Sequence, residues 1–116
     1  MISTSAEIEI LLGQWGTWTR AFGLGLRARS PLGDLLDRHM GRGVRLPIIA
    51  DETALLIDAE LARLRLEAPE LFRVLYLHHV ERLSLRAIGQ EMGFSYTTAR
   101  RRLREATAVA GERLLG

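Results

Sequence analysis

Five polar or basic side chains near the C-terminus stand at positions that a helix would bring to one face. They are Tyr96, Thr97, Arg100, Arg101 and Arg104. Guanidinium groups bind guanine edges and phosphates with paired hydrogen bonds, and hydroxyl groups bind either. Four arginines within five residues also repel one another unless an anion lies opposite them. The chemistry that this stretch predicts is recognition of DNA.

The element that would position these side chains is a helix-turn-helix between Leu83 and Arg104, which lays its second helix in the major groove. Ser84 is predicted to cap the first helix and Ser95 the second. Gly93 supplies the turn, because such corners need a residue that tolerates positive φ. The predicted inward residues are Leu85, Ile88, Met92, Phe94, Ala99, Leu103 and Ala106. The plainer alternative is an αα-hairpin with a solvated basic face.

Within this pattern the eight candidate DNA-binding residues divide into two groups. The residues placed for base-edge contacts are Tyr96, Thr97, Arg100 and Arg101. The residues placed for phosphate contacts are Ser84, Arg86, Ser95 and Arg104.

The N-terminal segment, residues 1–22, is predicted to be one helix that starts at a capping box from Thr4 to Glu7. Its apolar stripe comprises Ile8, Leu11, Leu12, Trp15, Trp18 and Phe22. Both tryptophans are therefore expected in the core. Gly13 and Gly16 lie off the stripe and weaken the helix, unless another backbone packs close there.

Residues 23–50 form a basic middle rich in Gly and Pro, with a short helix expected from Ser30 to about Met40. Its arginines suit an arm that touches nucleic acid or a large partner, although an ordinary connection is an equally good interpretation. The arm residues are Arg27, Arg29, Arg42 and Arg45.

Residues 51–81 are predicted to be two supporting helices, the first capped by Asp51 and running to about Leu66, the second running from Pro69 to about Glu81. Their inward residues would be Ala54, Ile57, Leu61 and Leu64, then Phe72, Leu75, Tyr76 and Val80. Residues 82–116 hold the helix-turn-helix, whose second helix is expected to run on unbroken towards Leu114. The fold class is thus all-α: one compact domain, residues 1–116, of about six helices.

Charge is distributed unevenly along the chain. The net charge is +2, yet residues 82–104 hold six Arg and one Glu, whereas residues 51–81 hold three Arg and seven acidic residues. A basic module backed by an acidic segment is typical of a DNA-binding face with its back to solvent or to a protein. The chain has no cysteine, no basic leader at its N-terminus and no apolar run of membrane-spanning length. These features predict a cytoplasmic protein.

No catalytic or metal-binding pattern is apparent. His78 and His79 are adjacent on a predicted helix, so their rings should diverge by about 100° and not share a metal. One is expected at the edge of the core and the other on the surface. Nucleophile elbows, phosphate loops and metal-ligand spacings do not occur. We therefore expect no enzyme activity, no cofactor and no metal.

Two resemblances to known families rest on these residues. The segment from Leu77 to Ala106 resembles the C-terminal promoter-reading domain of bacterial sigma factors, with Ala99 where a larger β-branched residue is usual. Nearly the whole chain resembles the phage antitermination protein Q family, in its short form without a zinc finger. The motifs are Trp15-Gly16-x-Trp18, the acid-led helix at Asp51 and the string Leu83-Ser84-Leu85-Arg86-Ala87-Ile88.

The second resemblance implies a protein that switches on phage late genes. Members bind double-stranded DNA near a late promoter and load onto bacterial RNA polymerase held at a sigma-dependent pause. They then narrow and extend the RNA exit channel, so that terminator hairpins cannot form; whether more than one copy binds each polymerase is left open. Two alternatives are a sigma-like or repressor-type regulator acting at initiation, and a small terminase-type DNA-packaging module.

Overall fold

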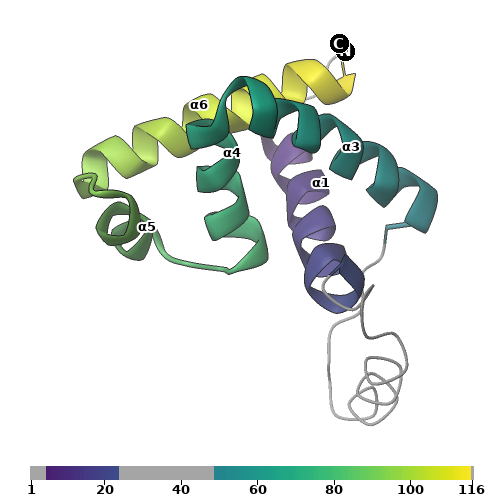
Figure 1. Cartoon of the computed structure of the whole chain (residues 1–116), viewed down its shortest axis with the longest axis horizontal. Helices are drawn as coiled ribbons and strands as arrows, with labels where there is room; N and C mark the ends of the chain where they lie inside the picture. The colour runs from purple at the N-terminus through teal and green to yellow at the C-terminus, as the bar shows by residue number, and fades with distance from the viewer. Residues whose placement is uncertain (1–4, 24–48, 116) are drawn as a thin grey trace, which may run out of the picture.

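A computed structural model describes residues 5–23 and 49–115, and every regular element within them is a helix (Figure 1). In chain order the elements are α1 (Ser5–Trp18), the π-helical turn η1 (Thr19–Gly23), α3 (Asp51–Glu67), α4 (Pro69–Leu75), the π-helical turn η3 (Tyr76–Val80), α5 (Leu85–Met92) and α6 (Tyr96–Leu115). The all-α class and the single globule are as predicted. Five of the six expected helices correspond to these elements. The sixth, from Ser30 to Met40, lies outside the described residues.

The α1 helix buries the predicted apolar stripe, with Ile8, Leu12, Trp15 and Trp18 in the core and Leu11 half-buried. The capping residue Thr4 and the side chain of Phe22 lie outside the described part of the chain. Both tryptophans are core residues, as expected, and both indole N–H groups have partners on α3. Trp15 Nε1 donates to Asp58 at 3.1 Å, and Trp18 Nε1 donates to Asp51 at 3.0 Å.

The prediction that Asp51 caps α3 is wrong. Ala50 occupies the N-cap position with extended backbone angles and no side-chain cap, and Asp51 is the first helical residue. Its carboxylate instead accepts the hydrogen bond from Trp18. Because the helix begins at Asp51 itself, this side chain lies one position past the N-cap, and its role is set by the tertiary contact with Trp18.

Gly16 marks the closest approach between α1 and another element. A Cβ atom placed there would overlap the main-chain carbonyl oxygen of His79 on η3. Another backbone therefore packs close to Gly16, which explains why a glycine is tolerated at this position in the helix. No backbone of the described residues packs close to Gly13, where a Cβ atom would meet nothing within 4 Å.

The α3 helix faces inward with Ala54, Ile57, Leu61 and Leu64, as predicted. Pro69 is the first residue of α4, also as predicted. The expected single helix to Glu81 changes to π-helical form at Tyr76, where Glu81 N bonds to Tyr76 O at 3.1 Å. A π-helical turn holds extra residues and shifts the inward phase. Leu75 and Val80 are buried as expected, Phe72 and Tyr76 are half-buried, and Val74 and Leu77 are buried in addition.

The buried side chains form two clusters. The main cluster joins α1, α3, α4 and α6, with Leu12, Trp15, Leu61, Leu64 and Leu75 at its centre. The small cluster consists of Leu77, Ile88 and Ala99, packed against Leu83, Leu85, Met92 and Phe94. Figure 1 shows α5 and the start of α6 at one end of the molecule and α3 at the other. None of the described helices is both long enough and apolar enough to cross a membrane.

Candidate nucleic-acid interface

The unit from α5 through the turn to α6 is specified by local hydrogen bonds. Ser84 caps α5, since its Oγ accepts from Ala87 N at 3.1 Å. Gly93 ends α5 in the left-handed region, at φ 78°. Ser95 Oγ accepts from Thr98 N at 3.1 Å, which satisfies an otherwise unpaired amide at the start of α6. The three positions therefore have the local roles that the sequence predicted for them, and α6 continues unbroken to Leu115.

The corner between α5 and α6 is too tight for a side chain at Gly89. A Cβ atom there would lie 2.6 Å from the main-chain oxygen of Phe94. Phe94 N bonds to Gly89 O at 2.7 Å, and the half-buried Phe94 ring packs on the small cluster. Ile88 and Ala99, both completely buried, hold the two helices together from the inside. The angle between α5 and α6 is thus fixed by packing among residues that lie close together in the chain, from Leu77 to Ala99.

All five residues predicted for the outer face of α6 are exposed: Tyr96, Thr97, Arg100, Arg101 and Arg104. At 100° per residue they lie within an arc of about 140°. The inward side of the same helix carries Ala99, Ala106 and Ala110, all buried as predicted. Thr107 lies in line with Tyr96 and Arg100 and is nevertheless buried, which the sequence did not predict. The name basic face is used here for the five exposed residues, Tyr96, Thr97, Arg100, Arg101 and Arg104.

Arg102 differs from the arginines around it. It bridges Glu70 on α4 and Glu105 on α6, each at 3.3 Å, and its guanidinium lies 5.9 Å from the centre of the Phe94 ring. By contrast, no ion pair of Arg100, Arg101 or Arg104 exists within the described residues. Arg102 fixes α6 to its support, and the other three have no counter-ion among the residues that the structure describes.

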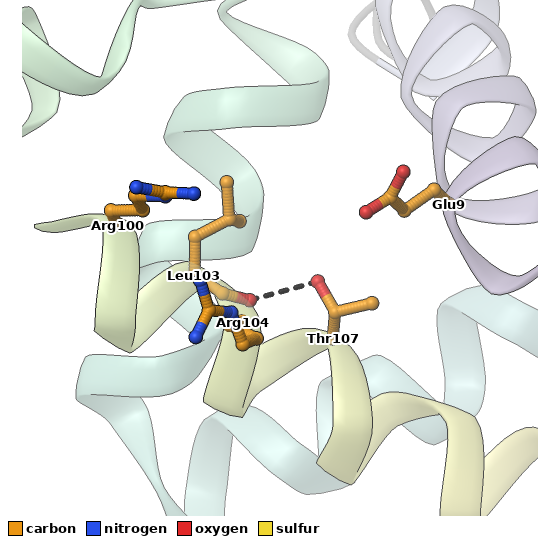
Figure 2. A pocket seen from close by; sticks show the side chains of 5 residues that line it. All are labelled: Glu9, Arg100, Leu103, Arg104 and Thr107. Carbon is orange, nitrogen blue, oxygen red and sulfur yellow. Dashed lines mark hydrogen bonds between the residues drawn. The ribbon is translucent and has the colours of Figure 1, made fainter. Parts of the chain in front are cut away.

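A shallow groove runs along one edge of the basic face. It has a volume of about 340 Å³ and is lined by Glu9, Arg100, Leu103, Arg104 and Thr107. Figure 2 shows the Glu9 carboxylate on α1 across the groove from the two arginines of α6. Thr107 Oγ1 donates to Leu103 O at 2.8 Å, so this hydroxyl is committed to its own helix. The groove brings together one acid and two bases from elements far apart in sequence.

The two histidines lie where Glu9, Leu103 and Thr107 line a second hollow, of about 280 Å³. The expectation that one of them would be a surface residue is wrong, because both are half-buried. Their rings also meet edge to face, with centroids 4.7 Å apart. Burial, and then the charge of His78, lower the pKa of His79 from 6.5 to about 4. Among the described residues no group of three or more acidic, His or Cys side chains is placed to hold a metal ion.

The remaining predicted site residues are placed as follows. Ser84, Arg86 and Ser95 are exposed at the N-terminal ends of α5 and α6. The arm residues Arg27, Arg29, Arg42 and Arg45 lie outside the described residues.

Sequence reasoning missed the ion pairs that hold the unit to the rest of the protein. Besides Arg102 with Glu70, Arg73 on α4 pairs with Glu91 on α5 at 3.5 Å. It also missed Arg82, which has φ 59° and donates to Thr17 Oγ1 at 3.0 Å. The charges were visible in the sequence, but their partners are defined only by the packing of α4 against α5 and α6.

The family model described as phage antitermination protein Q matches residues 5–115. Neither the search of curated proteins nor the search of solved structures found a match.

Proposed function

We propose that this protein binds double-stranded DNA with the basic face of α6 and loads from there onto bacterial RNA polymerase. The chain belongs to the phage antitermination protein Q family, so the activity that the binding would serve is transcription antitermination. The DNA would lie near a late promoter, and the protein would act in the cytoplasm of the bacterial host. Antitermination is regulation and requires no catalytic step from the protein.

The observation that carries the DNA-binding half is the absence of internal partners for Arg100, Arg101 and Arg104 within the described residues. Like charges at this spacing destabilise a helix slightly in isolation. A phosphate backbone relieves that repulsion and releases counter-ions as it does so. The face is also held rigidly, because the small cluster fixes α6 against α5. A rigid basic helix face at one end of the molecule suits insertion into a major groove.

The roles of the individual residues follow from their places on the unit. Tyr96, Thr97, Arg100 and Arg101 lie in the first two turns of α6, where a recognition helix meets base edges. Ser84, Arg86 and Ser95 lie at helix N-termini, which favour phosphates. Arg104 lies one turn after Arg100 and would reach the backbone beyond the groove.

The polymerase half of the proposal rests on the family and on the charge pattern. Residues 51–81 are acidic and residues 82–104 are basic. In the structure the acidic helix α3 lies at the opposite end of the molecule from α5 and the start of α6, with α4 between them (Figure 1). The protein could therefore hold DNA with one side while polymerase engages the rest. The sigma factor would take part as the component that holds polymerase at the pause.

The first experiment tests base reading. A duplex selected from a random pool by the purified protein, and a scrambled duplex of the same length, are titrated with wild type, Arg100→Ala and Arg101→Ala. We expect each variant to lose about 1–3 kcal/mol on the selected duplex and less on the scrambled one. Arg63→Ala is the matched control, because Arg63 is an exposed arginine on α3 whose ion pair, with Glu60 at 3.7 Å, lies within the same helix. Full affinity in both α6 variants would remove the basic face from the DNA site.

The second experiment separates antitermination from regulation of initiation or DNA packaging. Purified polymerase transcribes a template with a terminator far downstream of the selected binding site. Readthrough should rise with wild type, fall with Arg101→Ala and be unaffected by Arg63→Ala. Without any readthrough, increased initiation would identify a sigma-like regulator, decreased initiation would identify a repressor-type regulator, and no change in either would favour a DNA-packaging module.

A further inference from the structure

We infer that α3 is the contact surface for a second copy of this chain, arranged about a two-fold axis. The surface is the outer stripe of α3, defined by Leu55, Ala59, Ala62 and Leu66. All four residues are exposed, and Leu55 and Leu66 are exposed by 55% and 84%. Leu56 beside the stripe is exposed by 69%. Large apolar side chains gathered on one helix face mark an interaction surface far more often than isolated ones do.

The stripe is continuous on the helix. At 100° per residue its four members lie within an arc of about 60°. The buried face of the same helix, from Ala54 to Leu64, points the other way into the main cluster. α3 is therefore apolar on two opposite sides, and only one side is covered by the described residues of its own chain.

The spacing of the stripe is what identifies a second copy as the occupant. The order is Leu, three residues, Ala, two residues, Ala, three residues, Leu, which reads the same in both directions. If two copies of α3 pack antiparallel about a two-fold axis between Glu60 and Leu61, Leu55 meets Leu66 of the second copy and Ala59 meets Ala62 of the second copy. A two-fold interface requires this kind of self-complementarity. The small alanines at the centre let the helix axes approach closely while the leucines pack at both ends.

The charges beside the stripe agree with the same arrangement. Asp58 and Arg65 flank it on one side, and in an antiparallel pair that side faces its own copy. Asp58 Oδ1 accepts the hydrogen bond from Trp15, while its Oδ2 remains available within the described part of the chain, and the Arg65 guanidinium lies 5.9 Å from the centre of the Phe72 ring. Taking 1.5 Å per residue, Asp58 lies within about 3 Å, along the axis, of the level of Arg65 of the second copy. Opposite charges are thus brought together twice in the interface. The arrangement also leaves the basic faces accessible, because α3 and the start of α6 lie at opposite ends of the molecule (Figure 1).

The test is the mass of the full-length protein in solution. Sedimentation equilibrium of the wild type at micromolar concentration should give a dimer. Leu66→Glu should raise the dimer dissociation constant by about a hundredfold or more, because each substitution enters a two-fold interface twice. Ile10→Glu is the matched control, since Ile10 is a similarly large apolar residue, exposed by 59% on α1, outside the stripe. It should leave the dimer unchanged, and circular dichroism should show that both variants fold.

A cysteine pair tests the register independently, because the natural chain has no cysteine. Ala59→Cys and Ala62→Cys are made separately, mixed and mildly oxidised. The mixture should form a covalent dimer faster than either variant alone, since only the mixed pair lies directly opposite. Equal rates would overturn the two-fold register. A wild type that stays monomeric at micromolar concentration would overturn the dimer.

Discussion

The two hydrophobic clusters differ in how far along the chain their members are drawn from. The main cluster spans residues from Ile8 to Ala110 and joins four helices. The small cluster is built entirely between Leu77 and Ala99. Non-local packing of the first kind carries the stability of the globule, whereas local packing of the second kind orients one helix against its neighbour.

The difference teaches how this small protein separates stability from presentation of its basic face. The small cluster is attached to the main one through η3, where Leu77 belongs to the small cluster and Val80 to the main one. Two ion pairs from α4, Arg73 with Glu91 and Glu70 with Arg102, reinforce the attachment. We therefore expect α5, the turn and the first turns of α6 to open locally, while the second half of α6 stays in the main cluster through Ala106 and Ala110.

The largest effect should come from removing side-chain volume in either cluster. Leu61→Ala and Ile88→Ala each delete most of a fully buried side chain, and each should lower the free energy of unfolding by about 2–5 kcal/mol. The two variants should differ in native-state hydrogen exchange. Leu61→Ala should speed exchange throughout the described helices, because it weakens the main cluster. Ile88→Ala should speed it chiefly in α5 and the first turns of α6; uniform acceleration in both would show that the clusters unfold as one.

Acid should destabilise η3, which joins the two clusters, by nearly as much as either of these two substitutions destabilises the protein. The pKa of His79 is about 4 in the folded protein against 6.5 for an unperturbed histidine. Below pH 6.5 the unfolded chain binds a proton at this position and the folded protein does not. The free energy of unfolding therefore falls as the pH drops from about 6.5 to about 4. The loss from this group alone approaches about 3 kcal/mol.

Chemical denaturation of wild type and His79→Gln between pH 7 and pH 4 measures that loss. The stability difference between the two proteins should shrink as the pH falls. Glu9 and His78 line the same hollow, so His78→Gln is a useful second variant. It removes the smaller cause of the shift and should reduce the acid sensitivity only in part. A constant difference between wild type and His79→Gln would exclude this histidine as the origin.

Two glycine substitutions on α1 should give the smallest effects, with opposite signs. Gly16→Ala should destabilise by about 1–3 kcal/mol, because the new methyl group meets a rigid carbonyl oxygen on η3. Gly13→Ala should stabilise by about 0.5–1 kcal/mol, since nothing lies within 4 Å and alanine favours the helix. Thermal melting compares them directly. If both substitutions changed the melting temperature in the same direction, α1 would not pack closely against η3 at Gly16.

The sequence by itself determined the features that depend on residues three to five apart. Ser84, Gly93 and Ser95 could be assigned their local roles because caps and left-handed turns are satisfied by the backbone next to them. The two sides of α6 could be separated because helical periodicity alone sorts buried alanines from exposed arginines.

Only the tertiary structure decided the features that depend on distance between helices. Asp51 became the acceptor for Trp18 instead of a cap, and Gly16 rather than Gly13 proved to be the contact glycine. The half-burial of His79 and the exposure of Leu55 and Leu66 could not be predicted either, since periodicity shows that a face is apolar but not what lies against it. The physical reason is that these properties arise from packing between segments far apart in the chain, and local interactions do not specify such distances.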